Sequence, residues 1–102
     1  MIKTFRCQET EQISLGHHSR RFGNIETVAR RKLRMIEAAT KLEDLKAPPA
    51  NRLEALSGTR NGQHSIRIND QWRVCFVWRG GDAYGVEIVN YHLSYAPSRA
   101  HV

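Results

Sequence analysis

The sequence predicts an α+β domain in which an N-terminal strand and two helices pack on one face of a mainly antiparallel sheet. A helical spacing of apolar residues between positions 25 and 40, followed by period-two alternation after residue 62, supports this class. The chain has 102 residues, 40% of them hydrophobic, which is enough to bury one core without disulfides or metal. We therefore expect a single domain.

The first half of the chain carries the helices. Residues 2–7 combine β-branched and aromatic side chains and predict a first strand, and the polar run 8–15 predicts a short helix. Asn24 is a suitable N-cap for an amphipathic helix that runs to about residue 40. A further short helical stretch at residues 42–46 must end before the two prolines that follow.

The second half of the chain predicts a meander of strands. Residues 52–56 are compatible with a strand, and residues 63–69, 72–79 and 83–89 each alternate with period two. Turns at residues 69–71 and 80–82 join these three strands. The apolar positions would form one face from Ile66, Ile68, Trp72, Val74, Phe76, Trp78, Tyr84, Val86 and Ile88.

The opposite face of this sheet collects polar residues. If the hairpin loop is residues 69–71, Arg67 lies directly opposite Arg73, and like charges in that position destabilise a sheet. Such a pair requires either a bound anion or a neutralising carboxylate, for which Glu87 has the right parity. Tyr91 shares this outward parity and is followed by His92. We expect substitutions of Arg73 and His92 to leave the fold nearly intact, because outward-facing strand or terminal positions carry little core packing.

The net charge is +6, and twelve of the sixteen basic residues are arginine. Arginine forms bidentate contacts with phosphate, so a nucleic-acid partner is one explanation. The alternative is a basic surface for solubility or for an acidic protein. Arg30, Arg31 and Arg34 on the long helix are likewise either a solvated face or a partner surface.

Several classes are excluded or disfavoured by the sequence. No apolar stretch approaches the roughly 18 residues of a membrane span, and residues 1–7 lack the apolar run of a secretory signal, so we expect a cytoplasmic protein. The two cysteines lie far apart, and the five histidines show no metal-ligand spacing. We assign no metal and no cofactor.

Arginine, tyrosine and histidine on one face suit RNA cleavage through the 2′-hydroxyl. That reaction needs a base for the hydroxyl, an acid for the leaving 5′-oxygen and a cation for the phosphate. Histidine can transfer protons near neutral pH, tyrosine can orient or stack on a base, and arginine can hold phosphate. A Tyr-His pair at a strand end is also common as a purely structural feature.

The sequence resembles the HigB branch of the RelE-like toxins. The matching segments are residues 51–56 (Asn-Arg-Leu-Glu-Ala-Leu), the glycines at 58 and 62, residues 65–76 and residues 86–92. The Asn-x-x-Trp-Arg turn at residues 69–73 and the Tyr-His pair at residues 91 and 92 are the most specific. The resemblance covers nearly all of residues 1–92, which it defines as one toxin domain. Residues 93–102 are then an extension that is disordered, foreign or regulatory.

The resemblance implies a toxin that enters the ribosomal A site and cleaves messenger RNA there, and that a HigA-like antitoxin neutralises. Arg73, Tyr91 and His92 match the family's catalytic positions. The RNA- or phosphate-binding set it implies is Arg60, Arg67, Glu54 and Asn90. Glu54 is also a candidate partner for a nearby arginine.

Three positions depart from the family pattern. Glu54 stands where some relatives have histidine, Ser57 where many have lysine, and Asn90 where an acid usually precedes Tyr-His. These changes remove a possible proton acceptor and a cation. Ser57 and Asn90 support an alternative in which the chain is a weak or inactive relative that only binds the ribosome or its antitoxin. A third possibility is a regulatory protein that acts within a DNA-binding toxin–antitoxin complex.

Overall fold

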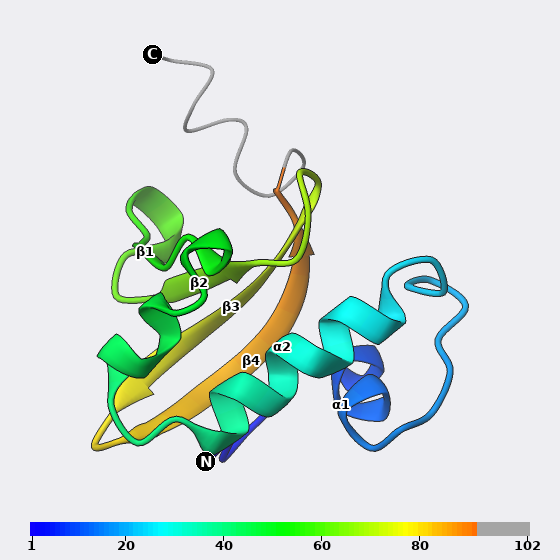
Figure 1. The fold of residues 1–102 in the computed structure, drawn as a ribbon, viewed down its shortest axis with the longest axis horizontal. Helices are drawn as coiled ribbons and strands as arrows, with labels where there is room; N and C mark the ends of the chain where they lie inside the picture. The colour runs from blue at the N-terminus through cyan, green and yellow to red at the C-terminus, as the bar shows by residue number, and fades with distance from the viewer. Residues whose placement is uncertain (92–102) are drawn as a thin grey trace.

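A four-stranded sheet forms the centre of the computed structural model, which describes residues 1–91 (Figure 1). Its strands lie in the order β1-β2-β3-β4, and each is antiparallel to its neighbour. The strands are β1 (Glu54–Ala55), β2 (His64–Arg67), β3 (Trp72–Arg79) and β4 (Asp82–Asn90). The predicted α+β class and the three-strand meander are confirmed, whereas the strand expected at residues 52–56 is only two residues long.

Two α-helices, α1 (Gln8–Ser14) and α2 (Glu26–Ala38), pack on one side of this sheet, with α2 crossing its face (Figure 1). The short 3-10 helices are η1 (Leu42–Lys46), η2 (Pro49–Asn51) and η3 (Gly58–Arg60). Asn24 is not the cap of α2, because the helix begins one residue later and Ile25 occupies the N-cap position. The main core between helices and sheet contains Ile13, Phe22, Ala29, Leu33, Ile36, Leu45, Ile66, Val74, Phe76, Val86 and Ile88.

The N-terminal segment forms two isolated parallel bridges to β4, Ile2 to Ala83 and Phe5 to Val86, instead of a continuous strand. Between the two bridges the Gly85 N–H donates to the Thr4 hydroxyl at 2.7 Å. The acceptor is thus a side chain and not a backbone carbonyl, as it would be in a regular strand pair. Residues 2–7, expected as a strand, therefore form only isolated bridges along the edge of β4. Such bridges protect the exposed edge of the sheet.

A β-bulge in the β3–β4 ladder changes which residues of β4 face the core. The register shifts between Cys75 and Val77, next to Gly85, whose φ of +60° is costly for other residues. Before the bulge Ala83 is fully buried, and Tyr84 is only half-buried, with the Arg79 guanidinium over its ring. The prediction that Tyr84 belongs to the apolar face is wrong because the bulge inserts one residue.

The β2–β3 hairpin has the predicted register. Arg67 is the ladder partner of Arg73, and Ile66 is the partner of Val74. The Asn69 side-chain oxygen accepts the backbone N–H groups of Gln71 and Trp72, both at 2.8 Å, which fixes the turn. Within residues 1–91, no helix has the length and apolar character needed to cross a membrane.

Candidate active site

The predicted site residues that the structure describes gather mainly at one end of the sheet. Arg67 and Arg73 lie opposite each other there, Asn90 is the ladder partner of Trp72, and Tyr91 follows β4 directly. Arg52, in the segment before β1, also borders the site. The resulting open hollow is lined by Arg52, Glu54, Arg67, Asn69, Asp70, Arg73 and Tyr91.

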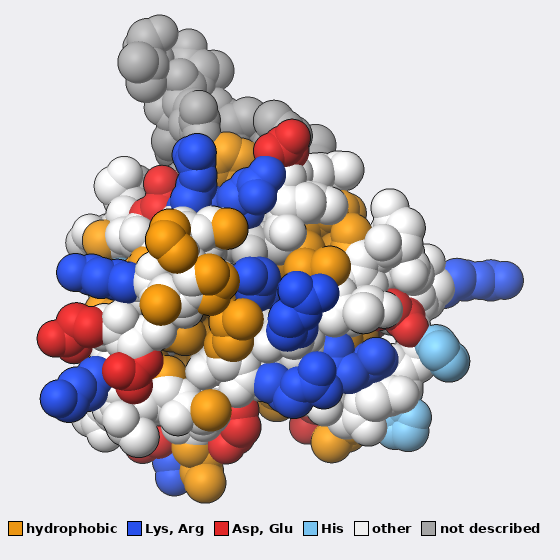
Figure 2. All heavy atoms as spheres, in the orientation of Figure 1, with side chains coloured by type: hydrophobic (Ala, Val, Ile, Leu, Met, Phe, Trp, Pro, Cys, Tyr) orange, Lys and Arg blue, Asp and Glu red, His pale blue; other side chains and the backbone are white. Residues whose placement is uncertain are grey.

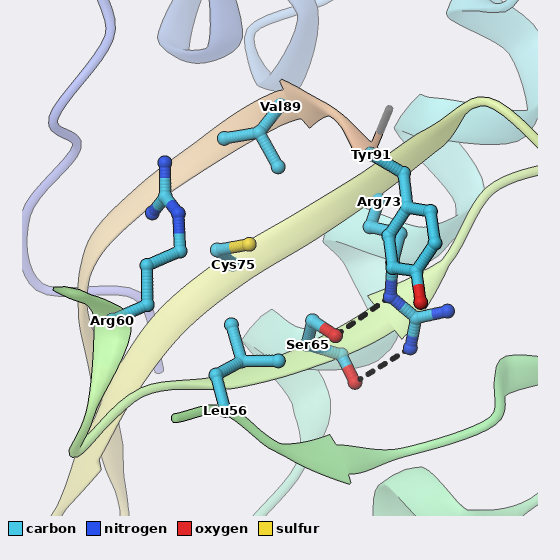
Figure 3. A pocket seen from close by; sticks show the side chains of 7 residues that line it. All are labelled: Leu56, Arg60, Ser65, Arg73, Cys75, Val89 and Tyr91. Atoms are coloured by element: carbon cyan, nitrogen blue, oxygen red, sulfur yellow. Dashed lines mark hydrogen bonds between the residues drawn. The ribbon is translucent and has the colours of Figure 1, made fainter. Parts of the chain in front are cut away.

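Arg73 is the most constrained side chain of the site. It is 6% exposed, and its Nε donates to the Ser65 hydroxyl at 2.7 Å (Figure 3). Its Nη2 donates to the Arg52 carbonyl at 2.6 Å and to the Ser65 carbonyl at 3.4 Å. The expectation that this outward position carries little packing is wrong, because the side chain is buried and hydrogen-bonded to Ser65 of β2 and to the Arg52 carbonyl in the segment before β1.

Each arginine of the opposed pair has its own carboxylate. A Glu54 oxygen lies 3.6 Å from Arg73 Nη2, and Arg67 forms an ion pair with Asp70. The expectation that Glu54 partners a nearby arginine is confirmed. These two carboxylates offset the repulsion across the hairpin.

Glu87 does not neutralise the opposed arginines. Its carboxylate lies 3.2 Å from the Arg60 guanidinium and 3.8 Å from that of Arg6. Arg60 also donates to the Gln63 side chain at 3.0 Å. Arg60 is thus held by polar partners on the same sheet face, at a distance from the Arg67–Arg73 pair.

Tyr91 lies next to the guanidinium of Arg73. The guanidinium carbon is 5.6 Å from the centre of the tyrosine ring, within the range of a cation–π contact. The Tyr91 backbone N–H donates to the Gln71 carbonyl, which ties the end of β4 to the hairpin loop. The third predicted catalytic residue, His92, lies outside the described residues, as does the extension at residues 93–102.

Between Arg60 and the Arg73–Tyr91 pair, the sheet face is apolar (Figure 3). Leu56, Cys75 and Val89 form a small buried cluster there. Burial raises the pKa of the Cys75 thiol to about 11, so this group stays protonated and is not a nucleophile at neutral pH. No three His, Cys, Asp or Glu side chains within residues 1–91 gather as metal ligands would.

Two contributors to the site were missed in the sequence analysis, Ser65 and the backbone of Arg52. The parity that places Arg67 on the outer face also places Ser65 there, so alternation alone could have indicated it. Arg52 adopts a left-handed conformation with a φ of +46°, the only non-glycine residue among the described residues with a positive φ. No pattern in the sequence marks that conformation.

Lysine and arginine side chains also gather over α2 on the face in Figure 2. Arg30 connects this helix to the segment around α1, since it donates to the Ile13 carbonyl at 2.9 Å and to the His17 carbonyl at 3.1 Å. Arg31 and Arg34 are exposed. The basic helix face therefore consists of one anchoring residue and two that are accessible to a partner.

Comparison with solved structures identifies the fold class. The chain superimposes on YafQ from E. coli strain BL21(DE3) with a TM-score of 0.60 at 7% identity, covering 93% of this chain and 99% of that one. A YafQ variant gives a TM-score of 0.56 at 9% identity. At these identities the likeness shows a shared fold alone.

The family follows from the sequence. Residues 13–93 match the family model described as the RelE-like toxin of the type II toxin–antitoxin system HigB. Because this match covers most of the chain, the protein belongs to the HigB family of RelE-like toxins.

Two curated relatives are consistent with this family. The chain is 45% identical over 60 residues to Toxin HigB-1 of Vibrio cholerae serotype O1, covering 59% of this chain and 63% of that protein. It is 34% identical over 61 residues to Endoribonuclease HigB of Proteus vulgaris, covering 60% and 65%, respectively. The matched region thus spans less than two thirds of each relative.

Proposed function

We propose that this protein is an endoribonuclease that cleaves messenger RNA in the ribosomal A site. The observation that carries the proposal is the Arg73 guanidinium, held beside Tyr91 and Glu54 at the mouth of an open hollow. A fixed cation at that place can stabilise charge that develops on a phosphate. The relative named Endoribonuclease HigB supports the same reaction class.

The proposed reaction uses the nucleophile that RNA itself carries. The 2′-hydroxyl gives its proton to a general base and its oxygen attacks the adjacent phosphorus, while the bond from phosphorus to the 5′-oxygen breaks and that oxygen takes a proton from a general acid. The products are a 2′,3′-cyclic phosphate and a 5′-hydroxyl end. No metal and no cofactor enters this scheme.

Three residues would carry out this reaction. Arg73 holds the scissile phosphate through its guanidinium, and His92 transfers a proton, because histidine titrates near neutral pH. Tyr91, whose ring lies against Arg73, orients the substrate. Phosphate binding displaces Glu54 from Arg73, and the released carboxylate remains at the edge of the hollow.

Two macromolecular partners belong to the proposal. The ribosome positions the messenger, since a few phosphate contacts from a small basic domain bind naked RNA weakly at physiological salt. A HigA-like antitoxin neutralises the toxin, as membership of a toxin–antitoxin family suggests. Arg67 would supply a further RNA contact in the hollow, and Arg60 and Asn90 would supply contacts outside it.

Mapping messenger 5′ ends after brief expression of the protein tests this function. We expect new 5′-hydroxyl ends within translated frames, and none with the Arg73→Ala variant. Growth arrest without new ends would instead indicate a relative that only occupies the ribosome. Neither arrest nor cleavage would indicate a regulatory protein and would contradict the proposal.

A further inference from the structure

Ser65 is a buried polar residue that contacts Arg73 but takes no part in the proposed chemistry. It is fully buried on β2, on the face that carries Arg73. Its hydroxyl accepts the Nε–H of Arg73 at 2.7 Å, and its carbonyl lies 3.4 Å from Nη2 (Figure 3). A hydrogen bond to a charged donor in a buried place is strong and directional.

The guanidinium of Arg73 is held from two separate segments. Ser65 binds it from the neighbouring strand, and the Arg52 carbonyl binds Nη2 at 2.6 Å from the segment before β1. Because Nε and Nη2 bind different acceptors, the two hydrogen bonds fix the plane of the guanidinium as well as its position. A free arginine side chain would lose substantial conformational entropy on adopting one such orientation.

We propose that Ser65 is a positioning residue that sets the orientation of Arg73 for catalysis. This inference rests on the proposed function, because it assigns Arg73 to the scissile phosphate. Ser65 itself is fully buried and lines a small cavity with Leu56, Cys75 and Val89, so it acts on the substrate only through Arg73. Its loss should slow the chemical step and leave binding to the ribosome unchanged.

The test compares Ser65→Ala with Cys75→Ala in single-turnover cleavage of messenger on programmed ribosomes. Ser65 and Cys75 are ladder partners, both buried on the same face, and each substitution removes one heavy atom. We expect Ser65→Ala to lower the maximal rate about ten-fold, the effect of one net hydrogen bond. The ribosome concentration at half-saturation should stay the same, and Cys75→Ala should change the rate less than two-fold.

Two further variants separate positioning from general destabilisation. Ser65→Thr retains the hydroxyl beside the small cavity lined by Leu56, Cys75 and Val89. It should recover most of the rate lost in Ser65→Ala. In an Arg73→Ala background, Ser65→Ala should have no additional effect, because the group that it orients is gone.

The possible outcomes are distinguishable. Equal rates for Ser65→Ala and Cys75→Ala, or an undiminished effect of Ser65→Ala in the Arg73→Ala background, would overturn the positioning role while Arg73 remains catalytic. If the wild-type protein does not cleave at all, or folded Arg73→Ala cleaves fully, the proposed function itself fails. Thermal melting of each variant establishes that it is folded at the assay temperature.

Discussion

At the scale of single residues, Arg73 belongs to both the core and the candidate site. Its guanidinium satisfies the Ser65 hydroxyl and the Arg52 carbonyl and lies close to the Glu54 carboxylate. A buried charge is tolerated only when it is paired and hydrogen-bonded, and this one is. Removal of the arginine should therefore affect both activity and stability.

Arg73→Ala should lower ribosome-dependent cleavage by about 10²–10³, the usual cost of losing one donor to a developing charge. It should also reduce the free energy of unfolding by about 1–3 kcal/mol, because buried acceptors lose their donor. Arg73→Lys should be nearly as slow, since an ammonium group does not reproduce the planar fork. The assay is cleavage by purified protein together with urea unfolding.

Arg79→Lys is the matched control for this prediction. Arg79 is on the same strand but exposed, with its guanidinium over the Tyr84 ring. We expect wild-type cleavage and a change in unfolding free energy of about 0.5 kcal/mol or less. Full cleavage by a folded Arg73→Ala protein would remove this residue from the site.

The Tyr-His end of the domain gives a second prediction at this scale. His92→Ala should lower the cleavage rate by roughly 10²–10⁴, the range for a lost proton-transfer group, with Tyr91→Ala next in effect. Asn90→Asp, which introduces the acid that the resemblance implies at this position, should maintain or raise the rate. Cleavage rates measured against pH provide the check, and an unaltered profile in His92→Ala would argue against proton transfer by this residue.

At the scale of elements, Glu26 joins the loop before α2 to the start of that helix. Its carboxylate accepts the Ser19 N–H at 2.8 Å and contacts His18 Nδ1 at 2.6 Å. The Ser19 N–H, and then the hydrogen bond with His18, hold the pKa of Glu26 below its usual value. The loop is thus fixed to α2 by an ionised side chain.

This lowered pKa has a definite consequence for acid stability. Because the unfolded chain protonates first, the contribution of Glu26 is complete above its ordinary pKa near 4.5 and is lost as the pH falls through the lower folded value. The melting temperature should therefore fall less steeply below pH 4.5 in Glu26→Gln than in the wild type. Glu43→Gln, at an exposed position, is the control and should follow the wild-type curve.

The sequence predicts those features of an element that depend on neighbouring residues, and it misses those that depend on contacts between distant residues. Period-two alternation was sufficient for β3 and for the Arg67–Arg73 register, because strand parity is a local property. The bulge at Gly85 and the edge pairing of the N-terminal segment depend on contacts between distant residues, such as Thr4 with Gly85. The burial of Arg73 depends likewise on the distant Arg52 backbone.

At the scale of the whole molecule, we expect the accessible arginines of α2, Arg31 and Arg34, to bind an acidic or amphipathic antitoxin. Opposite charges accelerate association, and salt weakens this effect. Arg31→Glu with Arg34→Glu should slow association with the genomically neighbouring antitoxin and reduce its salt dependence, as surface plasmon resonance would show. Arg30 is kept, because its bonds to the Ile13 and His17 carbonyls are structural.

Charge reversal at Arg79, an exposed arginine on β3, provides the control for that experiment. Arg79→Glu should leave the association rate closer to the wild-type value than Arg31→Glu/Arg34→Glu does. Unchanged association of Arg31→Glu/Arg34→Glu would exclude this helix face as the docking surface, while the toxin function would stand.

The most direct measurement for the central claim is cleavage of one purified messenger with and without programmed ribosomes. We expect the ribosome to supply orientation worth several kcal/mol by holding the messenger beside Arg73. We predict rapid cleavage at A-site codons by the wild-type protein on ribosomes. Cleavage of naked messenger should be slow at most and should not occur at defined codons. Rapid, codon-placed cleavage without ribosomes would contradict the account.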